Sequence, residues 1–177
     1  NNVCILFDTA PSTYVAPIFW FFVAYLIVRF AVEDTKRLMQ MKHLSLSLRR
    51  TSYGANVFLV AVAASFSLCL AIPPQENMVM HTSPFAALMI AFPLIFVMHC
   101  LQDQNRKMVV VVACTSFMVV SIVKFIFTFF TLLQLQDIGP IPGVISRPID
   151  LLWLLFAVSL PFIMPTPTVD PLEKNVA

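Results

Sequence analysis

The chain has 177 residues, of which 59% are hydrophobic and 11% charged, and its net charge is +2. A typical soluble domain carries about 25% charged residues, and a soluble globule of this size leaves about a third of its unfolded-chain surface in water. The composition therefore excludes a soluble enzyme, a nucleic-acid-binding protein and a disordered tail. Three glycines are also too few for a nucleotide-binding loop. We expect a membrane protein.

Five apolar segments alternate with polar connections. A membrane-spanning helix needs about 20 mostly apolar residues, and lipid excludes open strands because their backbone polar groups would lack partners. The segments cover residues 14–32, 53–72, 84–101, 108–135 and 149–164. The third has a proline, Pro84, in its first turn after a hydroxyl cap, and the fifth is the shortest. The sequence predicts an all-α, multi-pass bundle of about five transmembrane helices.

The bases lie mostly on one side of these spans. Lys and Arg are retained on the side from which a membrane protein is inserted. Five follow the first span, Arg106 and Lys107 follow the third, and Lys174 lies in the tail, whereas the opposite side has only Arg147. This bias predicts an outer N-terminal segment (1–13), a membrane domain (14–165) and a proline-rich inner C-terminal tail (166–177). Tyr14, Trp20 and Trp153 would then form an outer aromatic belt.

The connection at residues 33–52 has an amphipathic pattern. Leu38, Met41, Leu44 and Leu48 can line one side of a short helix, which would lie on the inner membrane surface. Its basic residues are Lys36, Arg37, Lys42, Arg49 and Arg50. Anionic lipid headgroups are attracted to such bases by about 1 kcal/mol each. An acidic face of a partner protein or a simply solvated loop are the alternatives.

The fourth span carries a polar stripe. Ser121, Lys124, Thr128 and Thr131 fall within an arc of about 80° on a helix. One interpretation is a helix contact, in which the hydroxyls bond to a neighbouring helix and Lys124 extends outward along its stem. The other is a hydrated ion path with Asp150 as the counter-ion. Arg29 lies near the inner end of the first span and is expected to reach the interface.

A second pattern concerns packing. Ala63, Ser67 and Ala71 recur every four residues in the second span, which predicts a small-residue stripe where another helix approaches closely. That helix can belong to this bundle or to a partner. Phenylalanines surround the first and fourth spans on nearly every side, which favours broad contact with lipid, a pigment or partner subunits.

Motifs for catalysis or metal binding are lacking in the sequence. His81 and His99 share a helix face but lie about 27 Å apart along it, too far for one metal ion. His43 lies in the basic connection, and no serine-hydrolase or zinc-protease motif occurs. Cys69, Cys100 and Cys114 lie in or at the ends of spans, so no disulfide framework is expected. We predict no catalytic residue, metal or cofactor, and expect bound lipids; a bound haem, quinone or pigment stays an open alternative.

These patterns favour a non-catalytic structural or accessory subunit of a larger membrane protein complex. An energy-transducing complex, respiratory or photosynthetic, in a mitochondrial inner or thylakoid membrane is the specific form of this expectation. Its partners would be other membrane subunits and lipids with anionic inner headgroups, and no nucleic acid. The alternative is a small transporter or channel subunit that uses the stripe around Lys124.

Overall fold

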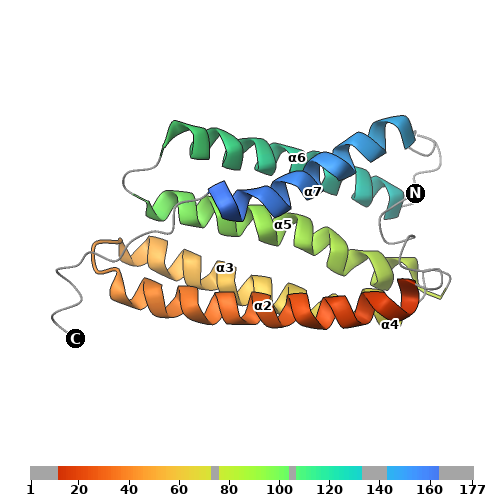
Figure 1. Cartoon of the computed structure of the whole chain (residues 1–177), viewed down its shortest axis with the longest axis horizontal. Helices are drawn as coiled ribbons and strands as arrows, with labels where there is room; N and C mark the ends of the chain where they lie inside the picture. The colour runs from red at the N-terminus through yellow and green to blue at the C-terminus, as the bar shows by residue number, and fades with distance from the viewer. Residues whose placement is uncertain (1–11, 73–75, 104–106, 133–142, 164–177) are drawn as a thin grey trace.

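The computed structural model describes residues 12–72, 76–103, 107–132 and 143–163, and all of its regular structure in these ranges is helical. The helices are α2 (Ser12–Gln40), α3 (Leu46–Ser65), α4 (Ser67–Ala71), α5 (Met78–Gln102), α6 (Met108–Leu132) and α7 (Gly143–Ile163). Successive long helices run antiparallel along one common direction (Figure 1). The predicted all-α bundle is confirmed.

Four helical stretches are long and apolar enough to cross a membrane: Val15–Gln40, Leu46–Ala71, Met78–Gln102 and Met108–Phe129. They overlap four of the five segments predicted as spans. In α7 the apolar stretch Pro148–Leu160 is shorter, so a full crossing by this helix stays a prediction. The chain thus has the architecture of a multi-pass membrane protein.

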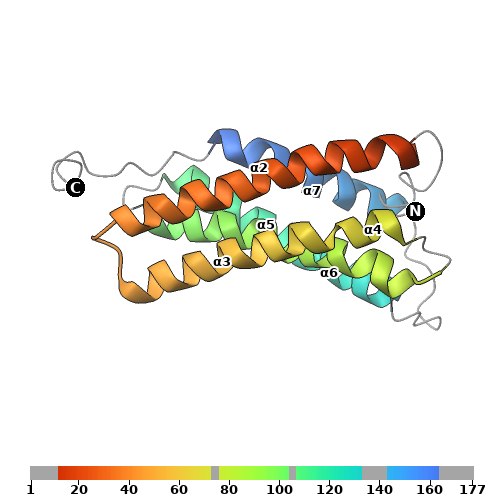
Figure 2. The same cartoon turned by 90° about the horizontal axis from the view of Figure 1, so that it is seen from below.

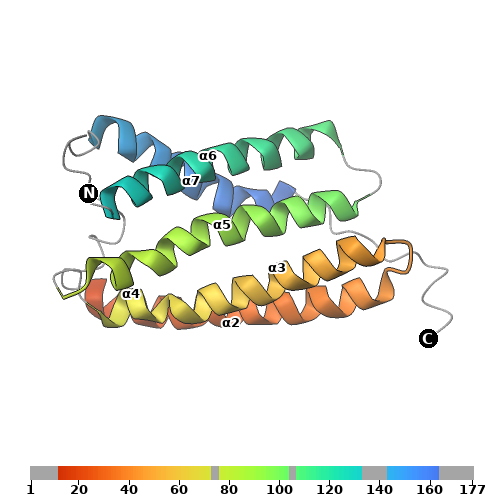
Figure 3. The same ribbon diagram turned by 180° about the vertical axis from the view of Figure 1, so that it is seen from behind.

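Helix α5 lies at the centre of the bundle. Figure 1 and the view from behind in Figure 3 show α2, α3 and α4 on one side of it and α6 and α7 on the other. Its side chains are buried on most faces, and Met89 and Ala91 are completely enclosed. Phe117 of α6 and Trp153 of α7 pack against each other and against α5 rings. The core is therefore a layer of aromatic and aliphatic side chains around α5.

The expected short helix at residues 33–52 is wrong. Residues 33–40 continue α2, α3 begins at Leu46, and only residues 41–45 separate the two. Glu33 pairs with Lys36 and Asp34 pairs with Arg37, each three residues apart, and such spacing stabilises a helix. Ser45 then caps α3 by accepting a hydrogen bond from the Leu48 amide at 3.2 Å.

The four apolar residues of this region do meet, but across the turn between two helices. Leu38, Met41 and Leu44 are buried together, with Leu48 packed against them. They cover the end of the α2–α3 pair instead of facing a membrane surface. We call this end of the bundle, where α2 and α5 finish and α3 and α6 begin, the basic end.

Two further details correct the sequence predictions. Helix α5 starts at Met78, six residues before Pro84, because Asn77 caps it by accepting a hydrogen bond from the Met80 amide at 3.0 Å.

Trp153 is a core residue whose ring nitrogen donates to the Ser121 hydroxyl at 3.0 Å, so it does not belong to an outer aromatic belt. Trp20 is half-buried on Phe66, with ring centroids 4.0 Å apart. The Tyr14 side chain lies outside the described residues.

The second span is broken into two helices at Phe66. Figure 2 shows α4 continuing from the end of α3. The hydroxyls of Ser65 and Ser67 donate to the carbonyls of Val62 and Ala64, at 2.9 and 2.7 Å, and serine bonds of this kind compete with the helical pattern and bend helices. Of the predicted small-residue stripe, Ala63 is buried in the core, whereas Ser67 and Ala71 are exposed.

We predict that the two ends of α5 lie on opposite sides of the membrane. Single cysteines replacing Glu76 and Lys107, in a variant without native cysteines, should react with an impermeant thiol reagent from opposite sides of sealed vesicles. Lys42→Cys is the matched control, because Lys42 lies at the same basic end as Lys107 and should react from the same side. Reaction of all three from one side would contradict the arrangement of spans.

Candidate functional site: two buried polar clusters

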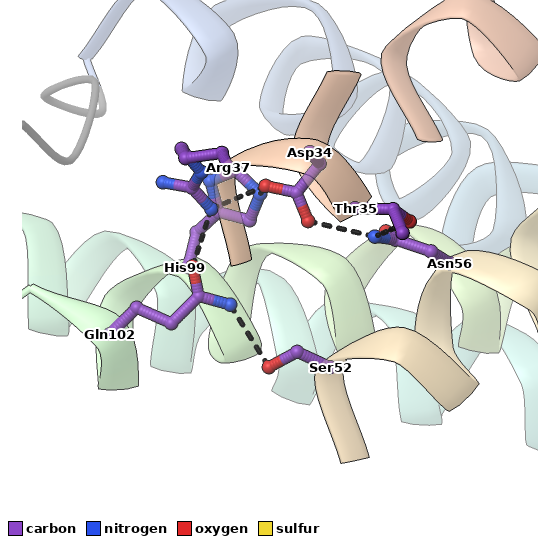
Figure 4. A network of polar contacts seen from close by, with 7 residues as sticks. All are labelled: Asp34, Thr35, Arg37, Ser52, Asn56, His99 and Gln102. Atoms are coloured by element: carbon purple, nitrogen blue, oxygen red, sulfur yellow. Dashed lines mark hydrogen bonds and ion pairs between the residues drawn. The ribbon is translucent and has the colours of Figure 1, made fainter. Parts of the chain in front are cut away.

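Seven polar side chains from three helices meet inside the basic end. Figure 4 shows them around the Asp34 carboxylate. We call this group the Asp34 cluster; its members are Asp34, Thr35, Arg37, Ser52, Asn56, His99 and Gln102. Asp34, Ser52, Asn56 and Gln102 are each at most 5% exposed. A carboxylate so deeply buried is tolerated only with several compensating partners.

Asp34 has partners on all three helices. Its Oδ1 is paired with Arg37 of its own helix and lies 3.1 Å from Nε2 of His99 on α5. Its Oδ2 accepts a hydrogen bond from Nδ2 of Asn56 on α3, at 2.8 Å. The imidazole of His99 also stacks on Phe30, with ring centroids 5.5 Å apart. One carboxylate therefore joins α2, α3 and α5.

A second chain of bonds runs through Gln102. Arg37 Nη2 donates to Gln102 Oε1 as well as to Asp34, and Gln102 Nε2 donates to the Ser52 hydroxyl at 2.9 Å. Gln102 thus connects the guanidinium of α2 with the start of α3. Both functions of its amide, acceptor and donor, are used between helices.

The structure distributes the five predicted lipid-contacting bases among different environments. Lys36 is exposed and paired with Glu33 at 3.0 Å, and Arg37 is directed inward to Asp34. Lys42 and Arg50 are exposed, whereas Arg49 is half-buried. Arg37 therefore contacts Asp34 and Gln102 inside the bundle, and contact of the five bases with anionic lipid or a partner stays a prediction.

The second polar site lies around Lys124, in the C-terminal half of α6. Ser121, Lys124 and Thr128 are all buried, so the predicted stripe faces the bundle interior. Lys124 is ion-paired with Asp150 of α7, and the exposed fractions of their side chains are 4% and 14%. Of the two interpretations from the sequence, the outward-reaching lysine is wrong. The Thr131 side chain lies outside the described residues.

Aromatic rings close the Lys124 site. The Lys124 ammonium lies 5.3 Å from the centroid of the Phe85 ring, a cation–π distance. Phe85 in turn packs against Trp153, which bonds to Ser121. Thr128 donates to the Lys124 carbonyl at 3.0 Å. The site therefore connects α5, α6 and α7 through one charge pair and its immediate neighbours.

The remaining candidates from the sequence are histidines and cysteines at several places in the bundle. His81 lies at the start of α5, far along the helix from His99, and its Nδ1 is 2.8 Å from the carbonyl oxygen of Ile72, which follows α4. His43 is exposed. The Cys69 thiol donates to the His81 carbonyl at 2.6 Å, and the side chains of Cys69, Cys100 and Cys114 are all buried. Within the described ranges, no three His, Cys, Asp or Glu side chains are grouped as metal ligands.

The sequence prediction omits most of the Asp34 cluster. It assigns residues 33–52 to a connection on the inner membrane surface and so overlooks Asp34 and Ser52, and it considers His99 only as a metal ligand. A usable signal exists in the spacing of α2, where Asp34 continues the stripe of buried residues Ile27, Ala31 and Leu38.

The chain matches no known protein family, and neither the curated proteins nor the solved structures include one that is significantly similar to it. The class of the protein, a multi-pass helical membrane protein with two buried polar clusters, therefore comes from its own sequence and structure.

Asn56→Ala should destabilise the protein by about 1–3 kcal/mol, because Asp34 Oδ2 then loses its buried donor. Thermal or chemical denaturation in detergent micelles measures the effect. Thr51→Ala is the matched control on the same helix, since the exposed Thr51 hydroxyl donates only to the Ser47 carbonyl of its own helix. Equal effects of the two substitutions would show that the bond to Asp34 contributes nothing.

Lys124→Met should destabilise the fold by about 3 kcal/mol, because Asp150 is left as an unpaired charge. In the double variant Lys124→Met/Asp150→Asn no charge remains, and most of the lost stability should return. The same denaturation measurement compares the two. If the double variant is as unstable as the sum of its single substitutions, the pair is not the interaction that holds α7 to α6.

Proposed function

We propose that this protein is a non-catalytic, structural subunit of a larger membrane protein complex. The observation that carries the proposal is the outer face of α2. Phe19, Phe21 and Phe22 have exposed fractions of 67%, 77% and 62%, and α2 is the least buried of the four long apolar helices. Large, rigid aromatic side chains that protrude from a span offer extensive packing surface to the helix of a neighbouring subunit.

The interior supports the same proposal. The Asp34 cluster and the Lys124–Asp150 pair bond helices of this chain to one another, which is what a scaffold requires. The specific form of the proposal is an energy-transducing complex, respiratory or photosynthetic, in a mitochondrial inner or thylakoid membrane. It is supported by the small size and low charge of the bundle, in which only residues 41–45 separate α2 from α3. Such a bundle suits a subunit that packs among others.

Size measurement tests the proposal. Extracted in a mild detergent, the native particle should have a mass of several hundred kilodaltons and contain a constant set of other proteins. Phe19→Ala/Phe22→Ala should release the chain from this particle without changing its thermal stability, because both side chains lie outside the bundle. Leu151→Ala/Leu155→Ala on α7 is the control, with exposed fractions of 68% and 63% in the intact chain, and should leave the particle intact.

A lone monomer, or release by both pairs of substitutions alike, would refute the role of the α2 face.

One observation favours a second candidate, a small transporter or channel subunit: a buried ion pair inside an apolar bundle is a common mark of an ion path. Ion flux through the unchanged protein and through Lys124→Met, each reconstituted in vesicles, distinguishes the two candidates. A transporter would conduct in the unchanged protein and lose this flux in Lys124→Met, whereas a structural subunit would conduct in neither.

A further inference from the structure

We propose that the basic end of the bundle binds one phosphate-type oxyanion between Arg37 and Arg49. The proposal concerns a site within the single chain, so it does not depend on membership of a complex.

Helix geometry places the two arginines on neighbouring helices, within about one turn of each other along the bundle axis. Arg37 is linked through Gln102 to Ser52, so it lies level with Ser52 of α3. Arg49 precedes Ser52 by three residues and therefore lies on the same face of α3, about 4.5 Å further along the axis. Arg49, Ser52 and Asn56 follow one another on the face that meets the Asp34 cluster. Two long guanidinium side chains at this spacing can hold one anion between them.

Both arginines carry buried donors without a partner. Nη1 of Arg37 and Nε of Arg49 are enclosed by protein atoms, and neither makes a hydrogen bond within the described part of the chain. The Asn56 side chain, only 2% exposed, also has an acceptor atom, Oδ1, without a partner. Buried polar atoms of this kind are costly unless a ligand or water satisfies them. The proposed oxyanion would accept hydrogen bonds from the two arginine donors, and a water or hydroxyl bound to it would donate to the Asn56 acceptor.

The charge balance favours an anion. Arg37 is neutralised by Asp34 and Lys36 by Glu33, whereas no acidic group in the described ranges pairs with Arg49. Lys42, in the turn between α2 and α3, and Arg50, in the first part of α3, are both exposed. Arg49 therefore contributes an uncompensated, half-buried positive charge, and the potential at the basic end is positive.

The shared chemistry is the phosphate group, and two sources can supply it. A lipid headgroup is available at this level because the long helices end here, and free phosphate is available from the water phase. Binding of either kind uses the planar guanidinium donors for phosphate oxygens.

Titration of the purified full-length protein in a neutral detergent tests the site. Short-chain phosphatidic acid and inorganic phosphate serve as separate probes, and the thermal shift at each concentration gives the dissociation constant. Arg49→Gln should weaken binding at least about tenfold, since a charge-assisted hydrogen bond and a unit charge are lost. Arg50→Gln is the matched control, since the adjacent exposed arginine should change binding by no more than about twofold.

The outcomes separate the sources and the alternatives. Binding of phosphatidic acid alone, with loss in Arg49→Gln, supports the site and identifies a lipid; binding of inorganic phosphate with the same loss supports it and identifies the free anion. Equal weakening by Arg49→Gln and Arg50→Gln would overturn the proposal in favour of diffuse surface attraction, and so would the absence of binding by both probes. Arg37→Lys retains the charge that pairs with Asp34 but removes the fork, and it should also weaken binding in a folded protein.

Discussion

The Asp34 carboxylate is the group on which the arrangement of α2, α3 and α5 depends. A buried charge in an apolar bundle must be matched by partners with defined positions, and here those partners come from three helices: Arg37, Asn56 and His99. Their geometry sets the relative register of the helices, because sliding any one helix by a turn would separate Asp34 from a donor. Apolar packing alone, which tolerates many registers in a bundle, would not specify this arrangement.

A similar constraint acts between α6 and α7. The apolar stretch of α7 is short, and a carboxylate near its start would oppose its burial among apolar helices. Lys124 compensates for this charge, and Trp153 and Ser121 add a hydrogen bond beside it. The two clusters thus have the same physical role at different places: each converts polar groups that lipid would reject into contacts between helices.

The fold class was predictable because apolar length is a strong signal: four long stretches of the sequence can only be helices in lipid. The contact of Lys124 with Asp150 was one of two alternatives, since helical spacing places the lysine on a polar face but does not say which helix the face meets. The Asp34 cluster was missed for a physical reason. Charged residues next to a turn predict a connection outside the bundle, whereas Asp34 and Arg37 neutralise each other and let α2 continue to Gln40 with Asp34 buried. Partners such as Asn56 and Gln102 are distant in sequence and carry no local signal.

The break at Phe66 has a consequence for the membrane itself. Helix α2 has 29 residues and is about 43 Å long, more than the roughly 30 Å of a hydrocarbon layer, so it must tilt or project. Its neighbour is divided into α3 and α4, and Trp20 of α2 packs on Phe66 where they join. A divided helix can change direction at the join while α3 stays locked by Ser52 and Asn56. The end of the bundle opposite the Asp34 cluster is therefore the part suited to adjust to bilayers of different thickness, at fractions of a kilocalorie per mole for each ångström of mismatch.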